Sequence, residues 1–207
     1  MRTLAIECAT EACSVALFEH GTLLAGDLRV LGRGHAEALV PMIAALPGKG
    51  QAGRIAVSLG PGSFTGLRVG LAAARALALA WQAELVGYPT MALVAAMART
   101  AHGSVPVSTA MTGGHGEWFV QEFDADGVAR GASTSFTPAA AAAAAALADL
   151  VAGSQAEALV ALRGRGTALA LLPDARELLS LADACFSPDV TLRYGRAPDA
   201  RLPEGAR

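Results

Sequence analysis

The sequence has few charged residues and few aromatic ones. Aspartate, glutamate, lysine and arginine together make up 16% of the 207 residues, and aromatic residues make up 5%. In a typical soluble protein, charged residues alone reach about 25%. Hydrophobic residues make up 53%, many of them alanine, and the mean hydropathy is +0.42. The chain can therefore build a core of ordinary size and still have apolar surface left for a partner.

An excess of positive charge is also absent. The net charge is −2 at pH 7 and the isoelectric point is about 6.1. A domain that binds a phosphate backbone by itself usually has a basic face and an isoelectric point above about 9. The composition therefore argues against stand-alone binding of nucleic acid.

Long apolar runs without charge are missing as well. The longest candidate, residues 69–86, carries Arg75 and Glu84, so we predict no membrane span. At the N-terminus, Glu7 comes too early for a signal peptide. We therefore expect a cytoplasmic protein.

The chain has three cysteines, Cys8, Cys13 and Cys185, and no Cys-x-x-Cys motif. An odd number without this spacing argues against a disulfide framework and against a zinc site. Cys8 and Cys13 could face each other across a hairpin. The favoured interpretation is that they are small buried thiols in a reducing compartment.

The first half of the sequence predicts strands and helices in the order β-β-β-α-β-α-β-α. The predicted strands are 3–8, 13–19, 22–30, 54–59 and 84–87, and the predicted helices are 35–46, 64–81 and 89–101. Three meandering strands followed by alternating helices and strands are typical of a mixed sheet with helices packed on it. The fold class is therefore α/β.

The second half repeats this plan in smaller form. The predicted strands are 105–110, 117–124, 128–134 and 158–162, and the predicted helices are 138–150 and 175–184. His102, Gly103 and Ser104 form a predicted joint. We therefore divide the chain into an N-terminal lobe, residues 1–101, and a smaller C-terminal lobe with a tail, residues 102–207.

Residues 60–70, GPGSFTGLRVG, follow a predicted strand and open a predicted helix. Backbone N–H groups at such a place can bind an anion, and Ser63 is a candidate N-cap. The spacing matches neither the dinucleotide fingerprint nor the P-loop. Two interpretations remain: a phosphate loop formed by Gly60, Gly62, Ser63 and Thr65, or a tight turn, which is favoured.

A second candidate site lies at the end of the first strand. Actin-like and sugar-kinase-like ATPases have Asp-x-Gly-Thr at this place, where the turn holds metal and phosphate. Here the acid is Glu7, Ala9 replaces the glycine, and Thr10 is retained. Because both changes weaken the catalytic interpretation, a capped hairpin turn is favoured.

The histidines do not form a recognisable metal motif. His35 opens a predicted helix, but the residue four positions later, which would complete a His-x-x-x-His pair, is Leu39. His20, His102 and His115 lie in predicted loops. We therefore predict no metal site in this chain.

Two predicted helices, 35–46 and 64–81, are apolar on nearly all sides. Arg68 and Arg75 are the only long polar side chains of the second helix, and Pro41 should kink the first or delay its start. A helix that is apolar all round must be buried all round. Either the second half of the chain covers the outer faces, or a partner protein does, which is favoured. The predicted interface residues are His35, Leu39, Met42, Ile43, Leu46, Leu67, Arg68, Leu71 and Arg75.

Several of these segments resemble the TsaB family, also called YeaZ-like. The resemblance rests on residues 6–17 (IECATEACSVAL), on His35-Ala36-Glu37 followed by Pro41-Met42-Ile43, and on the highly specific string at 60–70. The first hundred residues match in order and spacing. The second half matches weakly, at Gly116-Glu117 and at 194–200.

The resemblance implies an ASKHA, actin-like fold of two ribonuclease H-like lobes. It implies a heterodimer with TsaD, which transfers threonylcarbamoyl from its adenylate onto N6 of adenosine 37 in tRNA, and a transient ATPase partner, TsaE. This chain would be a non-catalytic subunit without a cofactor, would reach tRNA only through the complex, and could form a homodimer when alone. ATP and a metal would belong to the partner subunits; TsaD has a His-x-x-x-His pair where this chain has Leu39.

The sequence also departs from the family pattern. Family members usually have aspartate where this chain has Glu7, and Asp-Ala-Arg where it has Thr112-Gly113-Gly114. These departures weaken any residual nucleotide role. The alternative function is a small ASKHA-fold ATPase or phosphotransferase that uses Glu7, Thr10 and residues 60–65.

Overall fold

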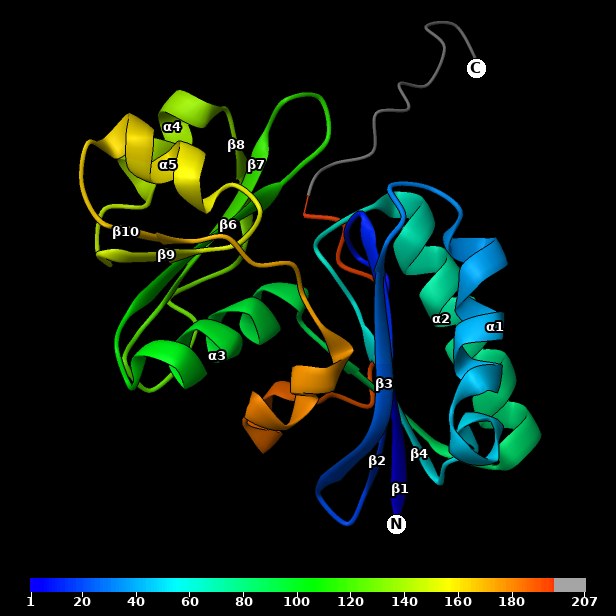
Figure 1. Ribbon diagram of the computed structural model, residues 1–207. Helices are drawn as coiled ribbons and strands as arrows, with labels where there is room; N and C mark the ends of the chain where they lie inside the picture. The colour runs from blue at the N-terminus through cyan, green and yellow to red at the C-terminus, as the bar shows by residue number, and fades with distance from the viewer. Residues whose placement is uncertain (196–207) are drawn as a thin grey trace, which may run out of the picture.

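The computed structural model describes residues 1–195 and contains two five-stranded mixed sheets (Figure 1). The first sheet has the order β3-β2-β1-β4-β5. Strands β1 to β3 are antiparallel neighbours, and β4 and β5 continue parallel to β1. Its strands are β1 (Arg2–Glu7), β2 (Ala12–Glu19), β3 (Thr22–Val30), β4 (Arg54–Ser58) and β5 (Glu84–Tyr88).

The second sheet repeats the same connectivity with shorter strands. Its order is β10-β9-β6-β7-β8, so the sixth strand takes the central place that β1 has in the first sheet. Its strands are β6 (Val107–Thr112), β7 (Trp118–Phe123), β8 (Thr134–Phe136), β9 (Leu150–Ala152) and β10 (Thr167–Leu169). This duplicated order confirms the predicted architecture of two ribonuclease H-like lobes.

The helices form three layers around the two sheets (Figure 1). Helices α1 (His35–Ala45) and α2 (Phe64–Trp81) cover the side of the first sheet that faces away from the second lobe. Helix α3 (Thr90–His102) lies between the sheets and packs on both. Helices α4 (Pro138–Ala144) and α5 (Ala156–Arg163) cover the outer face of the second sheet.

The C-terminal segment returns from the second lobe to the first. It forms two short 3-10 helices, η2 (Ala175–Ser180) and η3 (Asp183–Cys185). Beyond them, Ser187 exchanges two backbone hydrogen bonds with Gly87 of β5. We call residues 174–195 the C-terminal strap, because they lie against β2, the edge of β5 and the end of β4.

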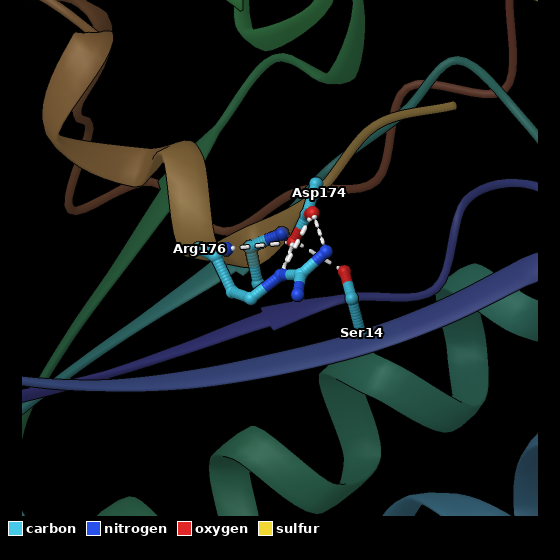
Figure 2. A network of polar contacts seen from close by, with 4 residues as sticks. Ser14, Asp174 and Arg176 are labelled. Atoms are coloured by element: carbon cyan, nitrogen blue, oxygen red, sulfur yellow. Dashed lines mark hydrogen bonds and ion pairs between the residues drawn. The ribbon is translucent and has the colours of Figure 1, made fainter. Parts of the chain in front are cut away.

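Figure 2 shows how the C-terminal strap begins on the first sheet. The Ser14 hydroxyl of β2 accepts a hydrogen bond from the Ala175 N–H, at 2.9 Å, and both groups are buried. Asp174 and Arg176 form a bidentate ion pair beside this contact, with Nη2–Oδ2 at 2.6 Å. The predicted lobe boundary after residue 101 lies at the end of α3 and stays a prediction.

The predicted elements of the first half are confirmed to within about two residues. The tight hairpin between β2 and β3 uses His20 and Gly21, whose φ angles of 51° and 77° are those of a turn that matches the strand twist. Of the two effects expected of Pro41, the late start does not occur, because α1 begins at His35 with Pro41 inside it.

The second half differs more from its prediction. Residues 158–162, predicted as a strand, lie in α5, which is followed by Gly164 in a left-handed conformation. The predicted helix 138–150 ends at Ala144, because residues 150–152 pair with β6. The predicted strand 128–134 begins only at its last residue, and the predicted helix 175–184 is the pair η2 and η3.

Helix α2 meets the length and composition of a membrane-spanning helix. The core helix of a soluble protein meets the same criterion. Leu67, Leu71 and Ala74 of α2 are buried on the first sheet. We therefore describe α2 as a helix of the fold.

Candidate functional site

The turn after β1 is held by its own side chains. Glu7 Oε1 accepts the Ala9 N–H at 2.7 Å, and Thr10 Oγ1 accepts the Ala12 N–H at 3.2 Å. From α1, the His35 ring Nε2 lies 2.9 Å from the Thr10 carbonyl oxygen and 3.3 Å from that of Ala12. Glu7, Thr10 and His35 are all buried. The structure therefore shows the capped hairpin turn, and His35 stabilises it.

Glu7 is completely buried, and burial raises its pKa to about 7. The Ala9 N–H and the nearby Ser58 and Tyr88 hydroxyls favour the carboxylate but do not offset the loss of water. Within residues 1–195, Oε2 has no hydrogen-bond partner. A carboxyl group that holds its proton near neutral pH is a poor ligand for Mg²⁺, which prefers ionised carboxylates.

The loop 60–66 packs directly on this turn. The Ser63 N–H donates to the Ala9 carbonyl oxygen at 2.7 Å, and Ser63 Oγ caps α2 by accepting the Gly66 N–H at 3.2 Å. A Cβ at Gly62 would collide with the Ala9 carbonyl, and one at Gly66 with the Cys8 carbonyl. The two glycines thus permit a close backbone contact where a phosphate would otherwise lie, which supports the tight-turn interpretation.

The remaining residues of the candidate phosphate loop are accounted for in the same way. Gly60 has a φ of 94°, and a side chain there would collide with the Arg193 carbonyl of the C-terminal strap. Thr65 is exposed in the first turn of α2. The structure therefore brings the Glu7–Thr10 turn and the loop together. The two segments contact each other directly at the place where a phosphate would otherwise lie.

Cys8 and Cys13 face each other across the same hairpin. Their Sγ atoms are 3.6 Å apart, and both side chains are buried. Both thiols are free, as is Cys185. The hydrogen bond with Cys13 and burial raise the pKa of Cys8 well above its usual range. The same hydrogen bond lowers the pKa of Cys13, so Cys8 is the thiol of the pair that keeps its proton more firmly.

The corresponding turn of the second lobe holds a polar trio that the sequence did not indicate. The Thr112 N–H, at the end of β6, donates to Ser154 Oγ at 3.0 Å, and Gln155 Nε2 donates to Thr112 Oγ1 at 2.8 Å. The glycine before Ser154 was the one available signal for a tight turn at this place. No group of three or more His, Cys, Asp or Glu side chains suited to a metal ion occurs within residues 1–195.

The structure corrects the side chains predicted at the partner interface. Leu39, Met42, Ile43, Leu46, Leu67 and Leu71 are at most 6% exposed, and all except Leu67 belong to the core between the first sheet and its two helices. His35 is also buried, at 7%. These seven side chains face the chain's own interior, so a partner could reach only the opposite faces of α1 and α2.

Those opposite faces remain apolar and uncovered within the described residues. Val40 of α1 is 60% exposed and Leu79 of α2 is 84% exposed. Alanines and Pro41 fill much of the surface around them. Arg68 and Arg75, the other two predicted interface residues, are exposed on α2.

Comparison with known proteins identifies the family of this chain. Residues 29–192 match the family described as TsaD: tRNA N6-adenosine threonylcarbamoyltransferase. A protein of Escherichia coli K12 named tRNA threonylcarbamoyladenosine biosynthesis protein TsaB is 36% identical over 141 residues, which is 65% of this chain and 61% of the relative. The chain is a member of the TsaB (YeaZ-like) group of this family.

Further relatives agree with this assignment. The protein of the same name from Haemophilus influenzae is 33% identical over 113 residues, 52% of this chain and 48% of the relative. The structure of YeaZ from Pseudomonas aeruginosa superimposes with a TM-score of 0.73 at 27% identity, over 93% of this chain and 99% of that one. The ethanolamine utilization protein EutJ from Carboxydothermus hydrogenoformans shares the fold, with a TM-score of 0.52 at 12% identity, over 87% and 89% of the two chains.

Proposed function

We propose that this chain is the non-catalytic subunit of the machinery that makes N6-threonylcarbamoyladenosine at position 37 of tRNA. The relatives named for this pathway support the proposal, although the E. coli and H. influenzae matches span less than two thirds of those proteins. The observation that carries the non-catalytic role is the contact between the loop 60–66 and the Glu7–Thr10 turn. In this contact, Ser63 N–H is bonded to Ala9 and Glu7 holds a proton near neutral pH.

The partner in this proposal is TsaD, and the docking surface is the outer face of α1 and α2 around Val40 and Leu79. Two neighbouring helices with large exposed apolar side chains suit a desolvated helix-on-helix contact. TsaE is then a transient ATPase partner, and the same faces allow a homodimer when TsaD is absent. The subunit works in the cytoplasm, carries no cofactor, and leaves ATP and metal to its partners.

Light scattering after size-exclusion chromatography tests this proposal, with the chain alone and mixed with TsaD from the same organism. The wild-type mixture should give one heterodimer peak. Val40→Glu and Leu79→Glu each place a charge in the contact, so we expect at least a tenfold weaker association. The matched control is Leu162→Glu on α5, which is 55% exposed and remote from α1 and α2. A wild-type chain that ignores TsaD would contradict the proposal.

The alternative function, an ATPase acting alone, has its own test. Steady-state ATP turnover by the pure chain should not exceed background. Turnover that Glu7→Gln abolishes would show that the turn after β1 is catalytic, and would replace the scaffold proposal.

A further inference from the structure

An open groove lies between α2 and the last described residues of the C-terminal strap. Its volume is about 390 Å³. Four of its residues come from α2 and four from the strap: Arg68, Leu71, Ala72, Arg75, Val190, Thr191, Leu192 and Tyr194. Among the described residues, the lining of the groove therefore has two arginines, one tyrosine and no acid.

Arg68, in the lining of the groove, stacks on the Phe64 ring, which itself contacts Tyr194. Its guanidinium carbon lies 3.6 Å from the centre of the Phe64 ring and 5.8 Å from that of Tyr194. Its Nε donates to the Tyr194 hydroxyl at 3.2 Å, and the two rings are 4.9 Å apart. This arrangement leaves the two Nη groups of Arg68 available to an anion and gives them a defined direction.

Arg75 lies two helical turns further along the same face of α2. Seven residues correspond to about 10 Å along a helix. Arg75 is exposed and has no hydrogen bond or ion pair within residues 1–195. Asp189 is the acid nearest in sequence to the groove residues of the strap. Its carboxylate accepts two hydrogen bonds from Thr191, at 3.0 and 2.6 Å. The second cation is therefore unpaired.

We infer that this groove binds a short stretch of single-stranded RNA, with phosphates on Arg68 and Arg75 and a base on the Phe64–Tyr194 pair. The inference rests on the proposed function, which brings tRNA to the complex, and adds a direct contact to it. Aromatic faces beside cationic groups are the usual means of binding single strands without reading their sequence.

The spacing favours an extended polyanion over a small anion. The backbone positions of Arg68 and Arg75 lie about 10 Å apart along the helix, a separation that successive phosphates of one strand can bridge. The Phe64 side chain is 53% exposed. A base could stack on this exposed ring, whereas an acidic peptide would not require it. The overall charge of −2 explains why the isolated chain should bind only weakly.

The test uses the isolated chain and a fluorescein-labelled eight-nucleotide oligouridylate at low salt, followed by fluorescence anisotropy. The wild type should bind, and its affinity should fall as the salt concentration rises. The double variant Arg68→Gln/Arg75→Gln should lose at least tenfold in affinity, and its log–log salt slope should fall by about 1.4, at about 0.7 for each lost phosphate contact. Phe64→Leu should weaken binding and leave the slope unchanged.

Two matched controls keep the result specific. Arg29→Gln removes one arginine from β3 and should not change binding, and Arg68→Lys/Arg75→Lys should retain most of the salt slope. Uridine monophosphate should not compete at the oligonucleotide's concentration. No measurable binding by the wild type, or equal binding by the double glutamine variant, would overturn the inference.

Failure of this inference can be told from failure of the proposed function. The wild-type chain is therefore compared in both experiments, with TsaD in the chromatography above and with the oligonucleotide here. A wild-type chain that forms the heterodimer normally but does not bind the oligonucleotide contradicts only the RNA contact. Oligonucleotide binding that depends on the arginines in a chain that ignores TsaD contradicts only the subunit proposal.

Discussion

Glu7 carries an ionisable group where no water reaches it. Its pKa is about 7 in the folded protein and 4.5 in an exposed chain. Below pH 4.5 both states are protonated and no penalty arises, whereas between pH 4.5 and 7 the unfolded state releases its proton first. The contribution of Glu7 to stability is therefore lost as the pH rises through this window.

The expected loss between pH 5 and pH 8 is about 2–3 kcal/mol, at about 1.4 kcal/mol per pKa unit. Glu7→Gln has no proton to release, so its free energy of unfolding should be less sensitive to pH over this range. Urea unfolding at a series of pH values measures the difference between the two proteins. The control is Glu157→Gln, at an exposed position on α5. Parallel pH profiles for Glu7→Gln and the wild type would refute this expectation.

At the scale of the element, two glycines of α2 differ in how closely other residues approach them. Gly66 and Gly70 lie one turn apart in the same helix, and both are buried. A Cβ at Gly66 would collide with the Cys8 carbonyl, whereas one at Gly70 would meet the Cys8 side chain at 3.4 Å, an ordinary contact. The same substitution should therefore have opposite effects at the two positions.

Gly66→Ala should destabilise the protein by about 1–3 kcal/mol, because the backbone of the turn after β1 must move. Gly70→Ala should be neutral or stabilising by up to about 1 kcal/mol, because alanine favours the helix. Thermal or urea unfolding of both variants makes the comparison. Equal losses at the two positions would show that the helix, rather than the close approach of the loop, decides the outcome.

The sequence predicts elements well where local chemistry marks their ends. His20 and Gly21 mark the first hairpin, and Ser63 marks the start of α2. Residues 138–150 contain no glycine, and their only proline lies at the first helical position, so nothing local ends α4 at Ala144. That end is set by the pairing of β9 with β6, which depends on residues about forty positions apart. Short apolar runs such as 158–162 fit a strand or a helix equally.

The sequence indicated the two apolar helices of the candidate interface, but not which face of each helix points to the sheet. The apolar positions of α1 and α2 were evident, yet a helix with apolar residues on nearly every side does not indicate which side meets the sheet. Leu39 and Leu71 therefore appeared as suitable interface residues, although the sheet covers them. Val40 and Leu79 could be distinguished from them only once the sheet was placed.

At the scale of the whole molecule, the C-terminal strap joins the end of the chain to its first sheet. Ser14→Ala would leave the buried Ala175 N–H without its acceptor. We expect a loss of about 1–3 kcal/mol in the free energy of unfolding. Ser180→Ala, which removes an exposed hydroxyl bonded to the Glu177 carbonyl, is the control and should stay within about 0.5 kcal/mol of the wild type. Urea unfolding of the two variants measures both; an equally small loss for Ser14→Ala would mean that another acceptor replaces the hydroxyl.

The C-terminal strap also has a consequence for synthesis on the ribosome. The hydrogen bond of Ser14 forms only after residue 175 has been synthesised. The backbone hydrogen bonds of Gly87 and of the Leu59 carbonyl likewise need Ser187 and the Arg193 N–H. A nascent chain can therefore assemble the strands of its first sheet early but cannot complete that sheet's edge and inner face. Contacts so distant in sequence also slow folding. The first lobe to emerge is thus the last to be finished.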